Sequence, residues 1–401
     1  MGPTIIPRPR YLARLKDNMA NCNQVKVITG VRKSGKTTLL RQYREIAAAT
    51  GVKTILCEMQ SYSMSRYLDS VSLIEYLYPQ IPEDEPSFLF IDEVNEIRDW
   101  PKVINSVMID RRKCNVFITG SNSFMLSSEI STYLSGKNND IHVMPFSFSE
   151  YLRRYGSEDV QHMFRTFLAK GAMPIADPFS SEDEYISTMD GIYNTIMVKD
   201  VMERSDKTVS VFRLKRIISF VLESTGKRLS VNRIAAKTKL ANDTVERYLQ
   251  LLIDAFLIYP LGMCSIRGMD AIGAPAKYYV VDTGLRSAAL GYRVSDMGQL
   301  LETAVFLELI RRGYRVSVGD IDGNEIDFVA VKGESKEYYQ VCYTMASQET
   351  VDREVTPLRN IRDHFPKTII TADPLPQDFP DGVRVVNAVD WMRDDGIVFD
   401  S

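Results

Sequence analysis

Apolar residues in the first part of the chain occur in short runs, separated by longer polar and amphipathic stretches. The runs lie at residues 25–29, 53–57, 88–91, 115–119 and 141–144, and each has the length of a single strand. A nearly continuous apolar run is typical of a parallel strand that helices cover on both faces. The pattern therefore predicts an α/β core built on a mostly parallel sheet.

The middle of the chain is expected to be helical. Apolar positions follow a helical period from Phe148 to Glu203, and a second amphipathic region begins at Ser230, which is a good N-cap residue. Two short helices joined by a tight turn are typical of a helix-turn-helix. The elements expected in this second region are a helix over 231–237, a turn over 238–240, a helix over 242–252 and wing strands at 257–259 and 277–281.

Composition narrows the class of protein. The 401 residues are 45% hydrophobic and 25% charged, which is normal for a globular protein, and the length predicts two to four domains. Five scattered cysteines without C-x-x-C spacing argue against disulfides and a zinc site. The sequence has no apolar run of membrane-spanning length and no signal-peptide pattern, so a cytoplasmic location is expected. A net charge of -3 argues against polyanion binding by bulk charge.

The segment from Gly30 to Thr37 fits the pattern G-x-x-x-x-G-K-[ST] at every fixed position. It lies between the apolar run at 25–29 and a helix that opens near Thr38, so backbone N–H groups converge on a point where polyphosphate binds. Lys36 is expected to reach the β- and γ-phosphates, and the Thr37 hydroxyl to bind Mg²⁺. The predicted nucleotide-binding residues are Gly30, Val31, Arg32, Lys33, Ser34, Gly35, Lys36, Thr37 and Thr38.

Two carboxylates, Asp92 and Glu93, follow the apolar run at 88–91. Ligands of open α/β sheets bind at this carboxyl end of the strands. Asp92 is expected to help hold Mg²⁺, and Glu93 to orient and deprotonate the attacking water. The run at 53–57 predicts one strand between the phosphate loop and this acidic motif.

A polar turn, residues 120–123, ends the next apolar run. Thr119 and Ser121 are candidates for a contact with the γ-phosphate or the attacking water. The alternative is a Gly-Ser turn that only caps a helix expected over 123–134.

Together these motifs resemble the P-loop proteins that use a glutamate base, which include the AAA-type ATPases. More specifically, the chain resembles archaeal and bacterial AAA-type ATPases whose C-terminal half is a domain of unknown function, and the resemblance extends from about Arg10 to Val398. It implies ATP and Mg²⁺ as ligands, a homo-oligomer, and an arginine borrowed from a neighbouring subunit. The segments that carry it are 30–37, 92–93 with Trp100 downstream, 119–121 and 145–148.

Some positions follow this resemblance less closely. Lys137 stands where relatives carry an arginine, and it supplies charge without bidentate geometry. Tyr11 is expected to pack against adenine, or else to belong to a basic N-terminal arm. Arg111 and Arg112 are guesses for the borrowed arginine. The helices from 148 are expected to form a lid that responds to the γ-phosphate, with a plain helical spacer as the alternative.

The predicted helix-turn-helix is basic within an acidic chain. Residues 205–267 hold 11 lysines and arginines against 5 acidic residues, which is typical of a nucleic-acid footprint. Asp243 and Glu246 on the second helix would repel phosphates, so a protein-binding module is the alternative. The candidate DNA contacts are Lys239, Asn242, Thr244 and Arg247.

The last third resembles the PD-(D/E)xK nuclease fold, which needs oxygen ligands for Mg²⁺ and a lysine that offsets negative charge. Its expected elements are a helix over 299–312 and strands at 315–318, 325–330 and 338–343. Glu302 and Asp327 take the acidic positions, but Gln340 and Cys342 replace the usual E-x-K. Gln340 can still offer an oxygen to a metal, whereas Cys342 cannot supply the positive charge of the usual lysine. Lys332 or Lys336 would have to take over that role from another position in the sequence. A degenerate nuclease site is therefore expected, with purely structural roles for the two acids as the alternative.

The complete interpretation is an α/β protein with four parts. They are a P-loop AAA-type ATPase core at 1–147, a helical lid at 148–205, a winged helix-turn-helix at 206–270 and a degenerate restriction-endonuclease-like domain at 271–401. The expected function is Mg²⁺-dependent ATP hydrolysis coupled to binding of DNA or a protein partner. A nucleotide-gated nuclease and a non-catalytic ATP-binding switch are the alternatives.

Overall fold

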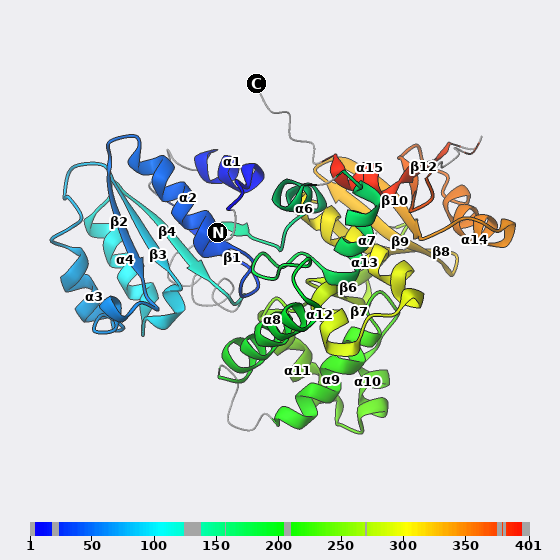
Figure 1. The fold of residues 1–401 in the computed structure, drawn as a ribbon, viewed down its shortest axis with the longest axis horizontal. Helices are drawn as coiled ribbons and strands as arrows, with labels where there is room; N and C mark the ends of the chain where they lie inside the picture. Colours follow the sequence, from blue (N-terminus) through cyan, green and yellow to red (C-terminus); the bar gives the residue numbers. More distant parts are fainter. Residues whose placement is uncertain are drawn as a thin grey trace. The chain divides into compact units, whose positions relative to one another are not determined.

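The computed structural model describes residues 5–17, 24–123, 138–156, 158–203, 210–268, 271–374, 379 and 382–394. Contacts divide the chain into two units, residues 1–145 with 254–256, and residues 146–253 with 257–401. Figure 1 shows the ribbon of both units. Within the described ranges, no helix has the length and apolar character needed to cross a membrane.

The first unit is built on a five-stranded parallel sheet in the order β2-β3-β4-β1-β5 (Figure 1). All five predicted strands are present, although the fifth begins and ends earlier than the predicted 141–144. They are β1 (Val25–Thr29), β2 (Lys53–Glu58), β3 (Ser87–Asp92), β4 (Cys114–Gly120) and β5 (Asn138–His142). β2 lies between the two motif strands along the chain, as predicted, whereas in the sheet β4 separates β1 from β3 and β2 lies at the edge. The order follows from long crossovers, which let consecutive strands be non-neighbours.

Helices cover both faces of this sheet, as the continuous apolar runs predict. α1 (Pro9–Asp17) and α2 (Lys36–Ala48) pack with Ile28, Phe90 and Phe117 in one cluster of buried side chains. α3 (Ser70–Leu77) and α4 (Trp100–Asp110) pack with Val27, Leu89 and other strand residues in a second cluster. The strand registers align the carboxyl ends of β1, β4 and β3 along one edge, where the motif residues then follow.

The second unit begins with helices. A capping box, in which Ser147 and Glu150 each accept a backbone N–H, starts α6 (Phe148–Tyr155). Ser230 accepts the Arg233 N–H and caps α10, which confirms the predicted start. The other helices of this stretch are α7 (Val160–Lys170), α8 (Glu182–Thr195), the π-helical η4 (Ile196–Met202), α9 (Val211–Glu223), α10 (Val231–Thr238), α11 (Asn242–Asp254) and α12 (Thr283–Leu290).

A seven-stranded mixed sheet forms the rest of the second unit, in the order β12-β11-β10-β9-β8-β6-β7. The two strands predicted as a wing, β6 and β7, pair with each other and continue this sheet, because β6 also pairs with β8. The strands are β6 (Ile258–Ser265), β7 (Ala271–Val280), β8 (Arg315–Ile321), β9 (Asn324–Lys332), β10 (Ser335–Cys342), β11 (Lys367–Thr371) and β12 (Val383–Asn387).

Two helices pack on opposite faces of the seven-stranded sheet. Phe328 of β9 packs against Phe306 of α13 (Met297–Arg311), whereas its neighbour Val329 lies in a cluster with Leu358 of α14 (Gln348–Arg359). Successive strand residues point to opposite faces, so α13 and α14 cover different sides. A short helix, α15 (Ala388–Arg393), ends the described chain. The predicted helix over 299–312 corresponds to α13 and carries Glu302 into this arrangement.

Candidate functional site

The loop from Gly30 to Thr37 joins β1 to α2 and depends on two glycines. Gly30 has a φ of +143°, and a Cβ there would lie 2.0 Å from the carbonyl oxygen of Val143, so no other residue fits. Gly35 adopts a left-handed conformation, with φ 99°, directly before the first turn of α2. The loop therefore leads straight into the N-terminus of a helix, where an anion is stabilised.

Lys36 folds back over this loop. Its Nζ donates to the carbonyl oxygens of Gly30, at 2.9 Å, and Val31, at 3.2 Å, and the side chain is buried. The Ser34 hydroxyl is also buried and has no hydrogen-bond partner within the described part of the chain. Both groups are donors that phosphate oxygens can engage.

The acidic motif meets the phosphate loop through a chain of hydrogen bonds. The Thr37 hydroxyl donates to Asp92 Oδ2 at 2.9 Å, and the Thr119 hydroxyl donates to Asp92 Oδ1 at 2.7 Å. The Thr119 oxygen in turn accepts the backbone N–H of Glu93 at 2.8 Å. Glu93 itself has a left-handed backbone, with φ 54°, a strained conformation that the Thr119 bond helps to hold.

The donor set of Thr37 and Asp92 fits Mg²⁺. Both residues offer oxygen atoms, and their approach within 3.1 Å places a hydroxyl and a carboxylate side by side. Mg²⁺ prefers oxygen ligands and is commonly held by one or two protein groups together with water and substrate phosphates. These two residues would hold the ion, and Glu93 directly follows Asp92 in the chain.

The remaining residues predicted for this site lie in different surroundings. Ser121 is buried and accepts a long, 3.5 Å hydrogen bond from Arg32. The Tyr11 ring is buried in the core with α2, and its hydroxyl accepts the Met144 N–H at 3.2 Å. Lys137 lies outside the described residues. Thr38 continues the first turn of α2.

The two arginines guessed as borrowed fingers differ in their contacts. Arg111 is engaged within its own unit, because it donates to the Ile81 carbonyl at 3.2 Å and lies over the Tyr78 ring. Arg112 is exposed and donates at 3.4 Å to the Ile109 carbonyl. The assignment of a borrowed arginine stays a prediction.

Thr119 links both acidic residues, so its loss is expected to destabilise this part of the first unit. In a Thr119→Val variant the methyl group keeps the shape, but Asp92 loses a donor and the buried Glu93 N–H loses its acceptor, which costs about 1–3 kcal/mol. We expect the free energy of unfolding to fall by about that amount, and urea unfolding checks this. Unchanged stability would show that Thr119 does not hold the two acidic residues together.

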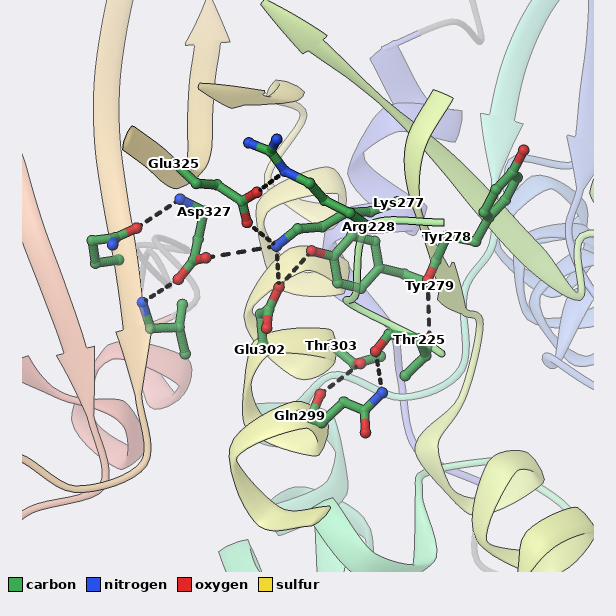
Figure 2. Close-up of polar contacts among 12 residues, drawn as sticks. Thr225, Arg228, Lys277, Tyr278, Tyr279, Gln299, Glu302, Thr303, Glu325 and Asp327 are labelled. Atoms are coloured by element: carbon green, nitrogen blue, oxygen red, sulfur yellow. Dashed lines mark hydrogen bonds and ion pairs between the residues drawn. The ribbon is translucent and has the colours of Figure 1, made fainter. Parts of the chain in front are cut away.

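A cluster of charged groups occupies the second unit (Figure 2). The Lys277 Nζ lies 2.9 Å from Glu302 Oε1, 2.9 Å from Glu325 Oε1 and 3.6 Å from Asp327 Oδ1. The structure thus brings the predicted Glu302 and Asp327 together and adds Lys277 from β7. One sequence signal could have found Lys277: it directly precedes the apolar run Tyr278–Val281, and a lysine in a buried strand needs a partner for its charge.

Gln340 and Cys342 take other roles in β10. The Gln340 Oε1 accepts the Asp327 N–H at 2.6 Å, and its Nε2 donates to Glu354 at 3.3 Å. Burial raises the pKa of Cys342 to about 11, and its thiol donates to the Thr344 carbonyl. Of the two lysines considered as migrants, Lys332 donates to the Arg312 carbonyl and Lys336 pairs with Asp363.

The predicted DNA contacts lie at the α10–α11 corner. Lys239, Asn242 and Arg247 are exposed, and Thr244 is half-buried. The Asn242 amide donates to the Asn232 side chain at 2.7 Å, which fixes the corner from within. Asp243 and Glu246 are exposed on the same helix.

Residues 22–152 match a family described as AAA domain, and residues 161–296 match a domain of unknown function. An uncharacterized protein of Haemophilus influenzae is 31% identical over 98% of this chain and 100% of its own length. A second, from Methanocaldococcus jannaschii, is 29% identical over 83% of this chain and 77% of its own length. Among solved structures, AMPPCP-bound DnaA from Aquifex aeolicus covers 62% of this chain and 89% of its own at 14% identity, but its TM-score of 0.30 supports no argument.

Proposed function

The chain belongs to the family of its Haemophilus influenzae relative and carries an AAA domain, and on this premise we propose that it is a Mg²⁺-dependent ATPase. The observation that carries the proposal is the hydrogen-bond chain from Thr37 through Asp92 and Thr119 to Glu93. It supports the role of Glu93 as general base, because it connects the Glu93 backbone to Thr37 at the end of the phosphate loop.

Each group of this site has a role in the proposed reaction. The loop N–H groups and Lys36 bind the phosphates, and Lys36 exchanges two backbone carbonyls for phosphate oxygens. Thr37 and Asp92 would hold Mg²⁺, which offsets phosphate charge when it is bound. Glu93 accepts the proton of the attacking water, and Thr119 fixes the backbone from which Glu93 extends.

Substitution of Lys36 tests nucleotide binding and hydrolysis together. A Lys36→Ala variant removes the loop ammonium expected to meet the β- and γ-phosphates, so we expect ATP turnover to fall at least about 100-fold. Lys53→Ala is the matched control, because Lys53 is an exposed lysine of the same unit at the amino end of β2, outside the phosphate loop. Equal activity of the two variants would contradict the proposal.

We also propose that the second unit binds DNA or a protein partner in a way that depends on the nucleotide, and that the chain assembles into a homo-oligomer. Exposed Lys239 and Arg247 near the α10–α11 corner support contact with an anionic partner, although Asp243 and Glu246 oppose it. Turnover measured with and without duplex and branched DNA, with the molecular mass determined in ATP, tests both statements. ATP turnover that does not change when DNA is added favours a protein partner. Tight ATP binding without any turnover favours the alternative of a non-catalytic ATP-binding switch.

A further inference from the structure

The fold resemblance of the second unit implies a Mg²⁺ site formed by Glu302, Asp327 and Gln340, but these residues do not fit a metal ion. The Gln340 oxygen accepts the Asp327 N–H, and Asp327 Oδ2 accepts the Val341 N–H at 2.9 Å. The other Asp327 oxygen faces Lys277. No group of three or more His, Cys, Asp and Glu residues within the described ranges has the arrangement needed to hold a metal.

An ammonium group already stands among the carboxylates. The Lys277 side chain is 3% exposed, and its three donors point at Glu302, Glu325 and Asp327, one from α13 and two from β9 (Figure 2). Glu302 Oε1 also accepts the Tyr279 hydroxyl at 2.7 Å. A buried ammonium needs partners for its charge and its donors, and here three carboxylates supply them.

We infer that the ammonium of Lys277 is the resident cation of this carboxylate cluster, and that the cluster fastens the connection between α9 and α10 to α13 and β9 without a divalent metal. This assignment concerns the second unit and does not depend on ATP hydrolysis.

Residues 225–228, within the connection between α9 and α10, contact the cluster and are termed the docking segment. Gly226 lies directly on Glu302, because a Cβ there would be 3.2 Å from Glu302 Oε2, and its φ is +72°. The Gly226 N–H donates to the Tyr278 carbonyl at 3.1 Å, and Arg228 forms an ion pair with Glu325. Two adjacent residues of β7 therefore make the two sets of contacts (Figure 2). Lys277 binds the carboxylates, and the Tyr278 carbonyl binds the docking segment.

The charges of the cluster explain why one lysine is sufficient. Three carboxylates face Lys277, and Arg228 partly compensates Glu325, whose pKa lies below its ordinary value because Lys277 and Arg228 outweigh the effect of burial. Burial and the neighbouring Asp327 raise the pKa of Glu302. Glu302 therefore binds a proton more readily than an ordinary glutamate, and this lowers the negative charge that Lys277 must balance.

Titration of the full-length chain with Mn²⁺ alone, in the absence of nucleotide, tests the inference by calorimetry. We expect Asp327→Asn to leave Mn²⁺ binding of the otherwise unchanged chain unaltered, since Lys277 fills the position. Lys277→Ala is expected to gain one site, at least about tenfold tighter than any background binding, and the double variant Lys277→Ala with Asp327→Asn to lose it again. Lys332→Ala, which removes an exposed lysine outside the cluster, is expected to gain none.

Loss of Mn²⁺ binding in Asp327→Asn alone would overturn the inference, as would a folded Lys277→Ala that gains no site. A second measurement covers the case in which Lys277→Ala does not fold. Arg228 is half-exposed, so Arg228→Ala should fold, and we expect amide exchange in the docking segment to rise at least about threefold. Unchanged exchange there would contradict the docking role of the cluster.

Discussion

A Glu93→Gln substitution is expected to abolish ATP turnover and to leave ATP binding intact. Glutamine keeps the size of the side chain and the backbone N–H that Thr119 accepts, but it cannot take a proton from water. General-base catalysis contributes about 10²–10⁴-fold to a rate, so kcat should fall by about that factor. Because Asp92 and Thr37 remain, the affinity for ATP with Mg²⁺ should change by less than about threefold.

Glu96→Gln is the matched control for this experiment. Glu96 lies three residues further on, is exposed, and accepts a hydrogen bond from Gln60 away from the phosphate loop. We expect its kcat to equal that of the unchanged chain. If Glu93→Gln hydrolyses ATP at the original rate in the same assay, the base has been assigned to the wrong residue.

Lys277→Met is expected to produce the largest loss of stability in the second unit. Methionine fills the same volume, but Glu302, Glu325 and Asp327 then face one another without a buried cation. Removal of one partner from a buried ion pair costs about 3–5 kcal/mol. Urea unfolding followed by Trp391 fluorescence measures the change, with Trp100→Phe in every chain, since these are the two tryptophans.

The deficit of Lys277→Met is expected to grow as the pH rises above about 7. The pKa of Glu302 is raised to about 7 by burial and by Asp327, while Lys277 lowers it, so removal of Lys277 raises it further. A carboxyl with a folded-state pKa above its unfolded value, about 4.3, stabilises the fold below that value and loses the contribution as the pH rises through the folded pKa. Above about pH 7 the variant therefore continues to lose stability from this group, whereas the unchanged chain has already lost most of the contribution of Glu302.

Two further chains complete the comparison. Glu302→Gln in the Lys277→Met background removes one of the uncompensated carboxylates and should recover at least about 1 kcal/mol. Lys332→Met, an exposed lysine that donates to the Arg312 carbonyl, should change the free energy of unfolding by less than about 0.5 kcal/mol. Equal deficits in Lys332→Met and Lys277→Met would show that the cluster does not hold the unit together.

Local sequence signals located most of the first unit. The apolar runs gave all five strands, and the two glycines of the phosphate loop take the positive φ angles that the motif requires. The meeting of Asp92 and Thr119 was also foreseeable, since carboxyl ends of neighbouring parallel strands share one edge of the sheet. The position of β4 between β1 and β3 could not be predicted, because the order of strands in a sheet depends on crossover connections that leave no periodic signal in the sequence.

The cluster around Lys277, in contrast, could be predicted only in part from local sequence signals. Glu302 and Asp327 were found from their spacing, but the residue that balances them lies 25 positions before Glu302, on the edge strand β7. Gln340 was expected to face a metal, yet its amide oxygen bonds to the backbone of its cross-strand neighbour Asp327. Both outcomes depend on how the sheet brings β7, β9 and β10 around α13.

The sequence by itself determined the phosphate loop, the acidic pair and the strands that carry them, because each arises from residues close together in the chain. Only the tertiary structure decided which cation the carboxylates of the second unit receive. Charge pairing acts over a few ångströms in space, and the fold brings Lys277, Glu302 and Asp327 within that distance from three separate elements.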